Sequence, residues 1–200
     1  MSDPVGALPE DVLELLRRFE RLLLTYSPRL GLLSPADLDR IWERHILDSL
    51  RALACLLPGD QILADVGSGA GLPGIPLAIA RPNIDVVLIE PMRRRAAFLE
   101  LVVEQLGLSK ARVVAGRAED AHLSASVVLA RAFASPSGLW AASEGLLGPE
   151  GRVVYFAGAS WQEGVAVPGA TIEVCLPGRL AWEGPLVIMR PASRLAEDGS

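Results

Sequence analysis

A glycine-rich turn between two apolar segments is the part of this sequence whose residue types and spacing most clearly indicate a binding or catalytic function. It reads DVGSGAG from Asp65 to Gly71, with glycine at positions 67, 69 and 71. Glycine is required where the backbone adopts a positive φ or where a ligand approaches too closely for a Cβ atom. Because such turns hold nucleotides in sheets of parallel strands, we interpret Gly67, Gly69 and Gly71 as part of a nucleotide site.

The spacing of these glycines distinguishes between kinds of nucleotide. Dinucleotide folds use the spacing GxGxxG and bind a pyrophosphate at the amides of the following helix. Here the third glycine comes one residue early, and Leu72 stands where that motif has glycine. Pro73 and Pro76 lack the amide hydrogens that a pyrophosphate needs. The turn therefore indicates a nucleoside without a pyrophosphate, such as S-adenosylmethionine (SAM), and disfavours an NAD-dependent dehydrogenase.

Acidic residues further along the chain are candidates to bind the ribose and the base of such a nucleoside. Glu90 ends the next apolar segment, close to the roughly 20-residue separation at which an acid accepts hydrogen bonds from ribose hydroxyls. The segment GRAED follows the third expected strand, and its Ala118 backbone and Glu119 carboxylate are candidates to contact adenine. The alternatives are that Glu90 is a solvated strand end and that Glu119 begins a helix.

Alternating apolar segments and helical periodicities surround these positions. Helices are expected at residues 10–24, 36–57, 72–80, 93–106 and 135–147, and strands at residues 61–66, 85–90, 111–115, 126–133, 152–157, 171–176 and 184–189. This order predicts a Rossmann-like α/β fold with a mostly parallel, doubly wound sheet and an antiparallel edge. We expect an N-terminal helical cap over residues 1–57, a SAM-binding domain over 58–192 and a disordered tail over 193–200.

Composition limits the location and the partners of the chain. Its 200 residues are 50% hydrophobic and carry a formal net charge of −5. The sequence has no apolar run of the roughly 18 residues that span a membrane and no basic leader, so we expect a cytoplasmic protein. The acidic total argues mildly against a nucleic-acid partner, but arginines cluster locally, as phosphate-binding patches or as solvated helix faces. The clusters are Arg17, Arg18 and Arg21; Arg40 and Arg44; and Arg93, Arg94 and Arg95.

The chain contains two cysteines, Cys55 and Cys175. They have no CxxC spacing and no histidine nearby in the sequence, which argues against a zinc site or a disulfide framework. We therefore expect both to be ordinary core residues in a reducing compartment, since free cysteine is often buried. No metal site is expected.

Four segments taken together resemble the bacterial RsmG/GidB family. They are DVGSGAGLPGIPLAIARP at residues 65–82, RHILDSL at 44–50, GRAE at 116–119 and ARAFA at 130–134. The resemblance implies the class I SAM-dependent methyltransferase fold and SAM as the cofactor. It also implies transfer of a methyl group to N7 of a guanine in 16S rRNA, with naked 16S rRNA or the 30S ribosomal subunit as the partner.

The same resemblance implies roles for individual residues. It places Gly67 and Leu72 along the SAM site, Ala118 and Glu119 at the adenine and Glu90 at the ribose. Arg131 would reach the site from the end of its strand, where it would fix the methionine carboxylate or hydrogen-bond the acceptor. His45 and Asp48 match the family motif H-x-x-D-S, which makes His45 the second candidate catalytic residue beside Arg131. For a lone helical histidine, a structural role is the alternative.

The sequence also departs from the family pattern. Ser27 and Gly31 replace two asparagines, and Ala157 replaces a lysine, at positions where polar side chains would face RNA or the target base. These losses keep two alternatives open: a SAM-dependent methyltransferase of small molecules, and a non-catalytic module that binds SAM or RNA. Because guanine N7 carries a lone pair and no proton, we expect no residue to transfer a proton. We expect the protein to be a monomer.

Overall fold

The computed structural model describes residues 8–132, 135–159, 161–162, 164–176 and 183–192. The strands are β1 (Ile62–Val66), β2 (Asp85–Ile89), β3 (Ala111–Val114), β4 (Ala125–Arg131), β5 (Leu147–Phe156), β6 (Ala170–Leu176) and β7 (Leu186–Pro191). The α-helices are α1 (Glu10–Leu30), α2 (Asp48–Leu50), α3 (Gly74–Ala80), α4 (Arg93–Leu106) and α5 (Pro136–Ser143). The predicted tail, residues 193–200, lies outside the described residues.

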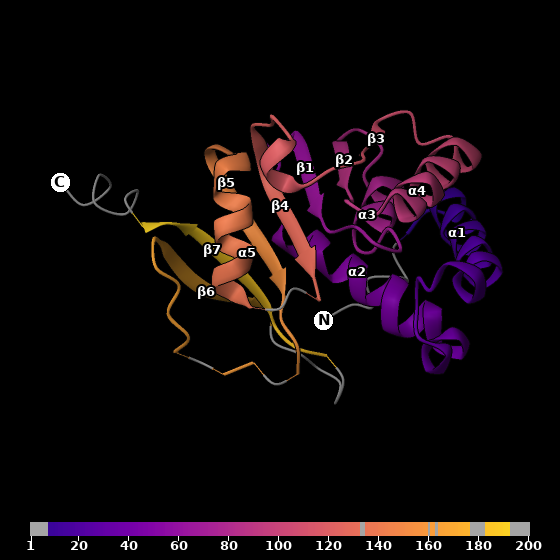
Figure 1. Cartoon of the computed structure of the whole chain (residues 1–200), viewed down its shortest axis with the longest axis horizontal. Coiled ribbons are helices and arrows are strands. Elements are labelled where there is room, and N and C mark those ends of the chain that lie inside the picture. Colours follow the sequence, from indigo (N-terminus) through magenta and orange to yellow (C-terminus); the bar gives the residue numbers. More distant parts are fainter. Residues whose placement is uncertain (1–7, 133–134, 160, 163, 177–182, 193–200) are drawn as a thin grey trace.

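Within the described residues, seven strands form one sheet in the order β3-β2-β1-β4-β5-β7-β6. The first five strands along the chain run parallel, whereas β7 pairs antiparallel with both β5 and β6. The strand order reverses between β1 and β4, which is the point where doubly wound sheets bind their ligands. The predicted Rossmann-like fold with an antiparallel edge is therefore confirmed (Figure 1).

Alternate residues of the central strands face two hydrophobic layers. Leu63 and Val86 pack in the layer that contains residues of α1, α3 and α4. Their neighbours Ala64 and Val87 pack in the layer that contains residues of α5. Figure 1 shows α1 beside α3 and α4, which lie between α1 and the strands β1 and β2. Because both faces are covered, these strands are almost continuously apolar in sequence.

The first helix, α1, extends six residues beyond its predicted end at Leu24. The prediction of a loop from Tyr26 is wrong as far as Leu30, because tertiary packing outweighs the single Pro28 inside the helix. The ring of Tyr26 lies 5.7 Å from the ring of Phe98 in α4, centroid to centroid. The helix ends where Gly31 adopts the left-handed conformation, with φ of 60°.

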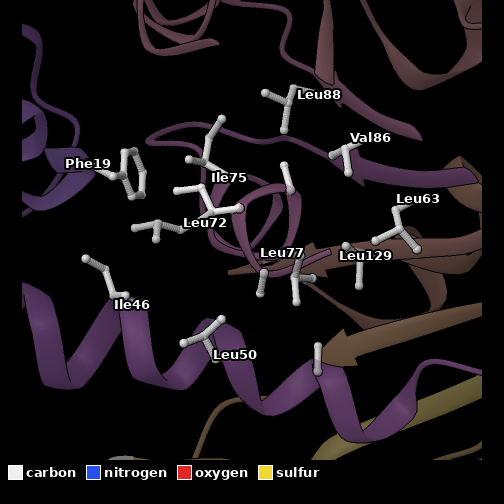
Figure 2. Packing of buried hydrophobic residues seen from close by; sticks show 14 of the residues in the cluster. Phe19, Ile46, Leu50, Leu63, Leu72, Ile75, Leu77, Val86, Leu88 and Leu129 are labelled. Carbon is white, nitrogen blue, oxygen red and sulfur yellow. The ribbon is translucent and has the colours of Figure 1, made fainter. Parts of the chain in front are cut away.

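The single helix predicted over residues 36–57 is interrupted. It is divided into the 3-10 segment η1 (Pro35–Arg40), the π-helical segment η2 (Trp42–Leu47), α2, and the 3-10 segment η3 (Arg51–Cys55). Ile46 and Leu50 still point into the core, as Figure 2 shows. The apolar spacing thus predicted a helical segment here and missed the change in helical winding. Short π-helical segments occur frequently at functional sites, and this one carries His45.

The N-terminal cap and the sheet share one hydrophobic core. Phe19 of α1 and Ile46 of η2 belong to the same buried cluster as Leu63 and Leu129 of the sheet (Figure 2). The cap therefore packs on α3 and α4, which in turn contact the strands of the sheet. In the part of the chain that the structure describes, no helix is long and apolar enough to cross a membrane.

Candidate active site

The glycine turn lies at the carboxyl end of β1, where each of its three glycines has a positive φ. The values are 72° for Gly67, 52° for Gly69 and 85° for Gly71. The amides of Gly67 and Ser68 donate to the carbonyl of Ile89, which ties the turn to the end of β2. The prediction that these positions require glycine is confirmed, since L-residues rarely adopt such φ values.

The space around each glycine distinguishes a glycine that packing requires from a glycine that leaves room for a ligand. A Cβ atom on Gly71 would lie 2.6 Å from Ile75 Cγ1, so this glycine is required by packing. A Cβ on Gly67 would meet no atom of the described residues within 4 Å, and one on Gly69 would meet nothing closer than 3.7 Å. The turn therefore presents its first two glycines to open space, into which a ligand can approach the backbone.

Glu90 lies directly beyond β2 and faces the glycine turn. Because Val66 pairs with Ile89 across the sheet, Glu90 stands beside the start of the turn. Its Oε2 accepts from the Gly69 amide at 2.9 Å, and its Oε1 accepts from the Met92 amide at 2.8 Å. The residue is 3% exposed. Each carboxylate oxygen can accept two hydrogen bonds, so both retain one acceptor position for a ligand.

Asp65 is a buried acid beneath the same turn, which the sequence reasoning quoted but did not assign to the site. Its Oδ2 accepts from the Gly74 amide at 3.0 Å at the start of α3. Its Oδ1 is buried and has no hydrogen-bond partner among the described residues. Burial raises the pKa of this carboxyl to about 7, and the Gly74 hydrogen bond offsets part of that effect. Asp65 thus offers an unused acceptor beside the turn.

Leu72 occupies the position that the resemblance assigns to the SAM site, but its side chain is buried in the hydrophobic core. It lies among Phe19, Ile75 and Leu77 in Figure 2. A ligand at the turn can therefore contact the Leu72 backbone, while the side chain supports the turn from below. In the short 3-10 segment η4 (Ala118–Asp120), Ala118 is buried and Glu119 is exposed.

Arg131 and His45, 86 positions apart in the sequence, lie side by side in the structure. Because Asp65 pairs with Leu129, Arg131 ends β4 at the same edge of the sheet as the glycine turn. Its Nη2 lies 2.8 Å from His45 Nδ1, and its Nη1 lies 3.4 Å from Asp48 Oδ2. A guanidinium can only donate, so His45 Nδ1 accepts. The structure therefore brings Arg131, His45 and Asp48 into contact.

The protonation state of His45 follows from this arrangement. Burial, and after it the charge of the nearby Arg131 guanidinium, together lower its pKa from 6.5 to about 4. The imidazole is therefore neutral at pH 7, with its proton on Nε2. That nitrogen is buried without a hydrogen-bond partner among the described residues, and its nearest acid, Asp37 Oδ2, lies 3.8 Å away. Asp48 also accepts from Arg51 Nη1 at 2.7 Å, which completes a polar network between the cap and the sheet.

The three positions that depart from the family pattern lie in or directly beyond α1 and β5. Ser27 is 2% exposed, and Gly31 ends α1 in the left-handed conformation. Asparagine and glycine are the residues that tolerate this conformation at a helix end, so the replacement at Gly31 preserves the helix end. Ala157 follows β5 and is 7% exposed.

Several arginines of the predicted patches are engaged within the protein. Arg17 pairs with Glu20 at 2.9 Å and lies 3.5 Å from the centre of the Trp42 ring. Arg44 pairs with Asp37 at 2.5 Å. These contacts favour the interpretation of the first two clusters as helix faces, while Arg93 and Arg94 are exposed at the start of α4.

Solved structures share the fold of this chain. A mutant of MtNAS in complex with S-adenosylmethionine has a TM-score of 0.60 at 21% identity and covers 89% of this chain and 72% of that chain. A SAM-dependent methyltransferase from Aquifex aeolicus has a TM-score of 0.58 at 12% identity, covering 78% and 98%. The fold is that of a class I SAM-dependent methyltransferase.

Sequence comparison identifies the family. The family model described as rRNA small subunit methyltransferase G matches residues 12–175. The ribosomal RNA small subunit methyltransferase G of Acidothermus cellulolyticus is 50% identical over 147 residues, which cover 73% of this chain and 66% of that relative. The chain belongs to the rRNA small subunit methyltransferase G family, which confirms the resemblance. It spans about two thirds of the length of this relative.

Proposed function

We propose that this chain transfers a methyl group from SAM to N7 of a guanine in the 16S rRNA of the small ribosomal subunit. The observation that carries the proposal is the glycine turn, whose open face adjoins buried acids, with the Arg131–His45 pair at the same edge of the sheet. Membership of the rRNA small subunit methyltransferase G family supports ribosomal RNA as the acceptor.

The residues around the turn fit SAM chemically. Gly67 and Gly69 leave room for the ligand to contact backbone, and Glu90 retains acceptor positions for the ribose hydroxyls. Asp65 Oδ1 is an unpartnered acceptor, within the described residues, for the cationic amino group. Gly71 and Leu72 shape the turn, and in this proposal the Leu72 backbone lines the ligand.

The adenine would lie beyond Glu90, between the end of β2 and η4. We assign Ala118 to contact with the base because it is buried at the start of η4. The exposed Glu119 would accept from the base amino group. Sequence resemblance supports both assignments.

The proposed reaction requires the protein to position the two reactants and does not require it to transfer a proton. Bound SAM supplies a methyl group on a sulfonium, which is a strong electrophile. Guanine N7 needs no base, and His45 is neutral with its accepting nitrogen already bonded to Arg131. We therefore assign Arg131 to orienting the donor carboxylate or the guanine, and His45 and Asp48 to holding the guanidinium. Holding both reactants in line accounts for most of such a rate enhancement.

Arginines at the start of α4 support an anionic acceptor. Arg93, Arg94 and Arg95 form the first turn of α4, directly after the donor-binding segment. Cations at a helix N-terminus oppose the helix dipole, so this placement favours binding over helix stability. Arg94 and Arg95 also donate to backbone carbonyls of Arg29 and Gly31 at 3.4 and 3.3 Å. We propose that this patch contacts RNA phosphates despite the net charge of −5, in a monomeric, cytoplasmic enzyme.

The test is transfer of labelled methyl groups from SAM to 16S rRNA and to 30S subunits, compared in parallel. We expect incorporation as 7-methylguanosine in at least one of the two substrates. Binding of SAM without incorporation into either would refute the proposal and would favour a small-molecule acceptor or a non-catalytic module. An Arg131→Lys variant should bind S-adenosylhomocysteine or RNA more weakly, because lysine cannot bridge His45 and Asp48 together.

A further inference from the structure

We propose that Cys55 and Cys175 form a reversible intramolecular disulfide on oxidation, which joins the N-terminal cap to the edge strand β6. The two residues are separated by 120 positions in the sequence, yet their Sγ atoms lie 2.8 Å apart. Their spacing in the sequence does not predict this contact. The inference does not depend on the proposed function.

The geometry requires little movement. Non-bonded carbon atoms sit roughly 3.5–4.0 Å apart, and a disulfide bond is about 2.05 Å long, so the observed separation lies between contact and bond. Cys55 is the last residue of η3 and is 4% exposed. Cys175 lies in β6, the outermost strand of the sheet at that end, and is half-buried. One thiol is thus shielded, and the other can be reached from solvent.

The surroundings assign different roles to the two thiols. Burial raises the pKa of Cys55, and its hydrogen bond with Cys175 raises it further, so Cys55 stays protonated at neutral pH. Arg152 Nη2 donates to the Cys55 carbonyl at 2.6 Å, and the Arg51 and Arg152 charges partly oppose that rise. The half-buried Cys175 therefore meets the oxidant first, and Cys55 is the resolving thiol.

The reaction balances with a peroxide as the oxidant. Hydrogen peroxide converts the Cys175 thiol to a sulfenic acid and releases one water. The Cys55 sulfur then displaces the sulfenic oxygen, the S–S bond forms, and the oxygen leaves as a second water with the Cys55 proton. Two electrons pass from the thiols to the peroxide. A dithiol such as dithiothreitol reverses the step by thiol–disulfide exchange.

The disulfide would tie together parts that are distant in sequence. It would close a loop that contains β1 to β5 and the whole glycine turn, and cross-links across long loops constrain the unfolded chain strongly. It would also fix η3, whose Arg51 pairs with Asp48 at 2.7 Å. We expect oxidation to raise the melting temperature by roughly 5–15 °C.

The experiment treats the full chain with hydrogen peroxide and measures intact mass, free thiols and melting temperature. Because the chain has two cysteines, loss of two hydrogen atoms from the monomer with loss of both thiols identifies this pair. We expect that product, a higher melting temperature and reversal by dithiothreitol. Cys175→Ser, at the half-buried position, should fold and show neither change; Cys55→Ser is the second control.

Three results would overturn the inference. One is a disulfide-linked dimer as the main product. Another is oxygen added to Cys175 while Cys55 remains a free thiol. The third is an intramolecular disulfide that leaves the melting temperature unchanged, which would show that the bond does not hold the cap to the sheet.

Discussion

Replacement of Glu90 by glutamine tests the donor site at a single buried carboxylate. The side chain is 3% exposed, and its two oxygens accept from the amides of Gly69 and Met92 at 2.9 and 2.8 Å. Glutamine keeps the shape of the side chain but replaces one oxygen by an amide nitrogen, which cannot accept a hydrogen bond. One backbone amide therefore loses its hydrogen-bond acceptor. Both ribose hydroxyls would lose a charged acceptor.

The magnitude follows from the hydrogen bonds involved. A hydrogen bond to a charged group contributes about 1.5–3 kcal/mol. We therefore expect Glu90→Gln to lower the free energy of unfolding by about 1–3 kcal/mol, through the lost backbone bond. Loss of the charged acceptor for ribose should weaken ligand binding by about 1–3 kcal/mol, which is roughly 5- to 150-fold in Kd.

The assay is calorimetric titration with S-adenosylhomocysteine, alongside urea unfolding of the same samples. Glu100→Gln, on an exposed face of α4, is the control with the same change of charge. We expect that control to bind like the wild type. If folded Glu90→Gln binds S-adenosylhomocysteine within twofold of the wild type, Glu90 only bridges the backbone of the turn, and the assignment to ribose is wrong.

Four further predictions concern the turn and the titrating groups. Gly71→Ala should lower the free energy of unfolding in urea by about 2–3 kcal/mol, because its Cβ would lie 2.6 Å from Ile75 Cγ1 at a φ of 85°. Gly69→Val, with open space beside it, should instead abolish S-adenosylhomocysteine binding while costing about 1–2 kcal/mol of stability; unchanged affinity would refute the placement of the ligand. In the folded protein the pKa of His45 is lowered from 6.5 to about 4. As the pH drops from 6.5 to 4, the unfolded chain therefore binds a proton at His45 before the folded chain does, and the free energy of unfolding falls. The loss is at most roughly 3 kcal/mol, and pH-dependent unfolding of His45→Gln should lack it. Asp65, with a pKa of about 7, becomes negatively charged between pH 6 and 8. Affinity for S-adenosylhomocysteine, through its cationic amino group, should therefore rise roughly tenfold over that range. A similar rise in the Asp65→Asn variant would exclude Asp65 as the source of the effect.

Much of the fold was predictable because its signals are local. The Val- and Ile-rich strands alternate with helices, which predicts the parallel sheet, and two final strands without a helix between them predict the antiparallel edge. The errors occurred where distant contacts outweigh local signals. Tyr26 packs on Phe98, which keeps α1 helical through Pro28. The π-helical winding around His45 has no marker in the local sequence, although the neighbouring Ile46 is buried in the core.

The candidate site was predictable to the extent that a motif marks it. Gly67 and Gly69 stand out through their spacing, and Glu90 through its position after the next strand. Asp65 was not distinguished, because its burial and its unpartnered oxygen exist only in the folded chain. The side chain of Leu72 points into the core, a direction that spacing alone does not reveal. The contact between Cys55 and Cys175 depends on the strand order at the sheet edge.

The central claim is that this chain methylates guanine N7 in 16S rRNA, and mapping 7-methylguanosine in ribosomal RNA tests it most directly. Ribosomal RNA from cells with and without the protein is cleaved chemically at 7-methylguanosine and the sites are compared. We predict a 16S rRNA site that disappears without the protein, returns with the wild-type chain and returns weakly with Glu90→Gln. Identical cleavage in the presence and absence of the protein would contradict the account.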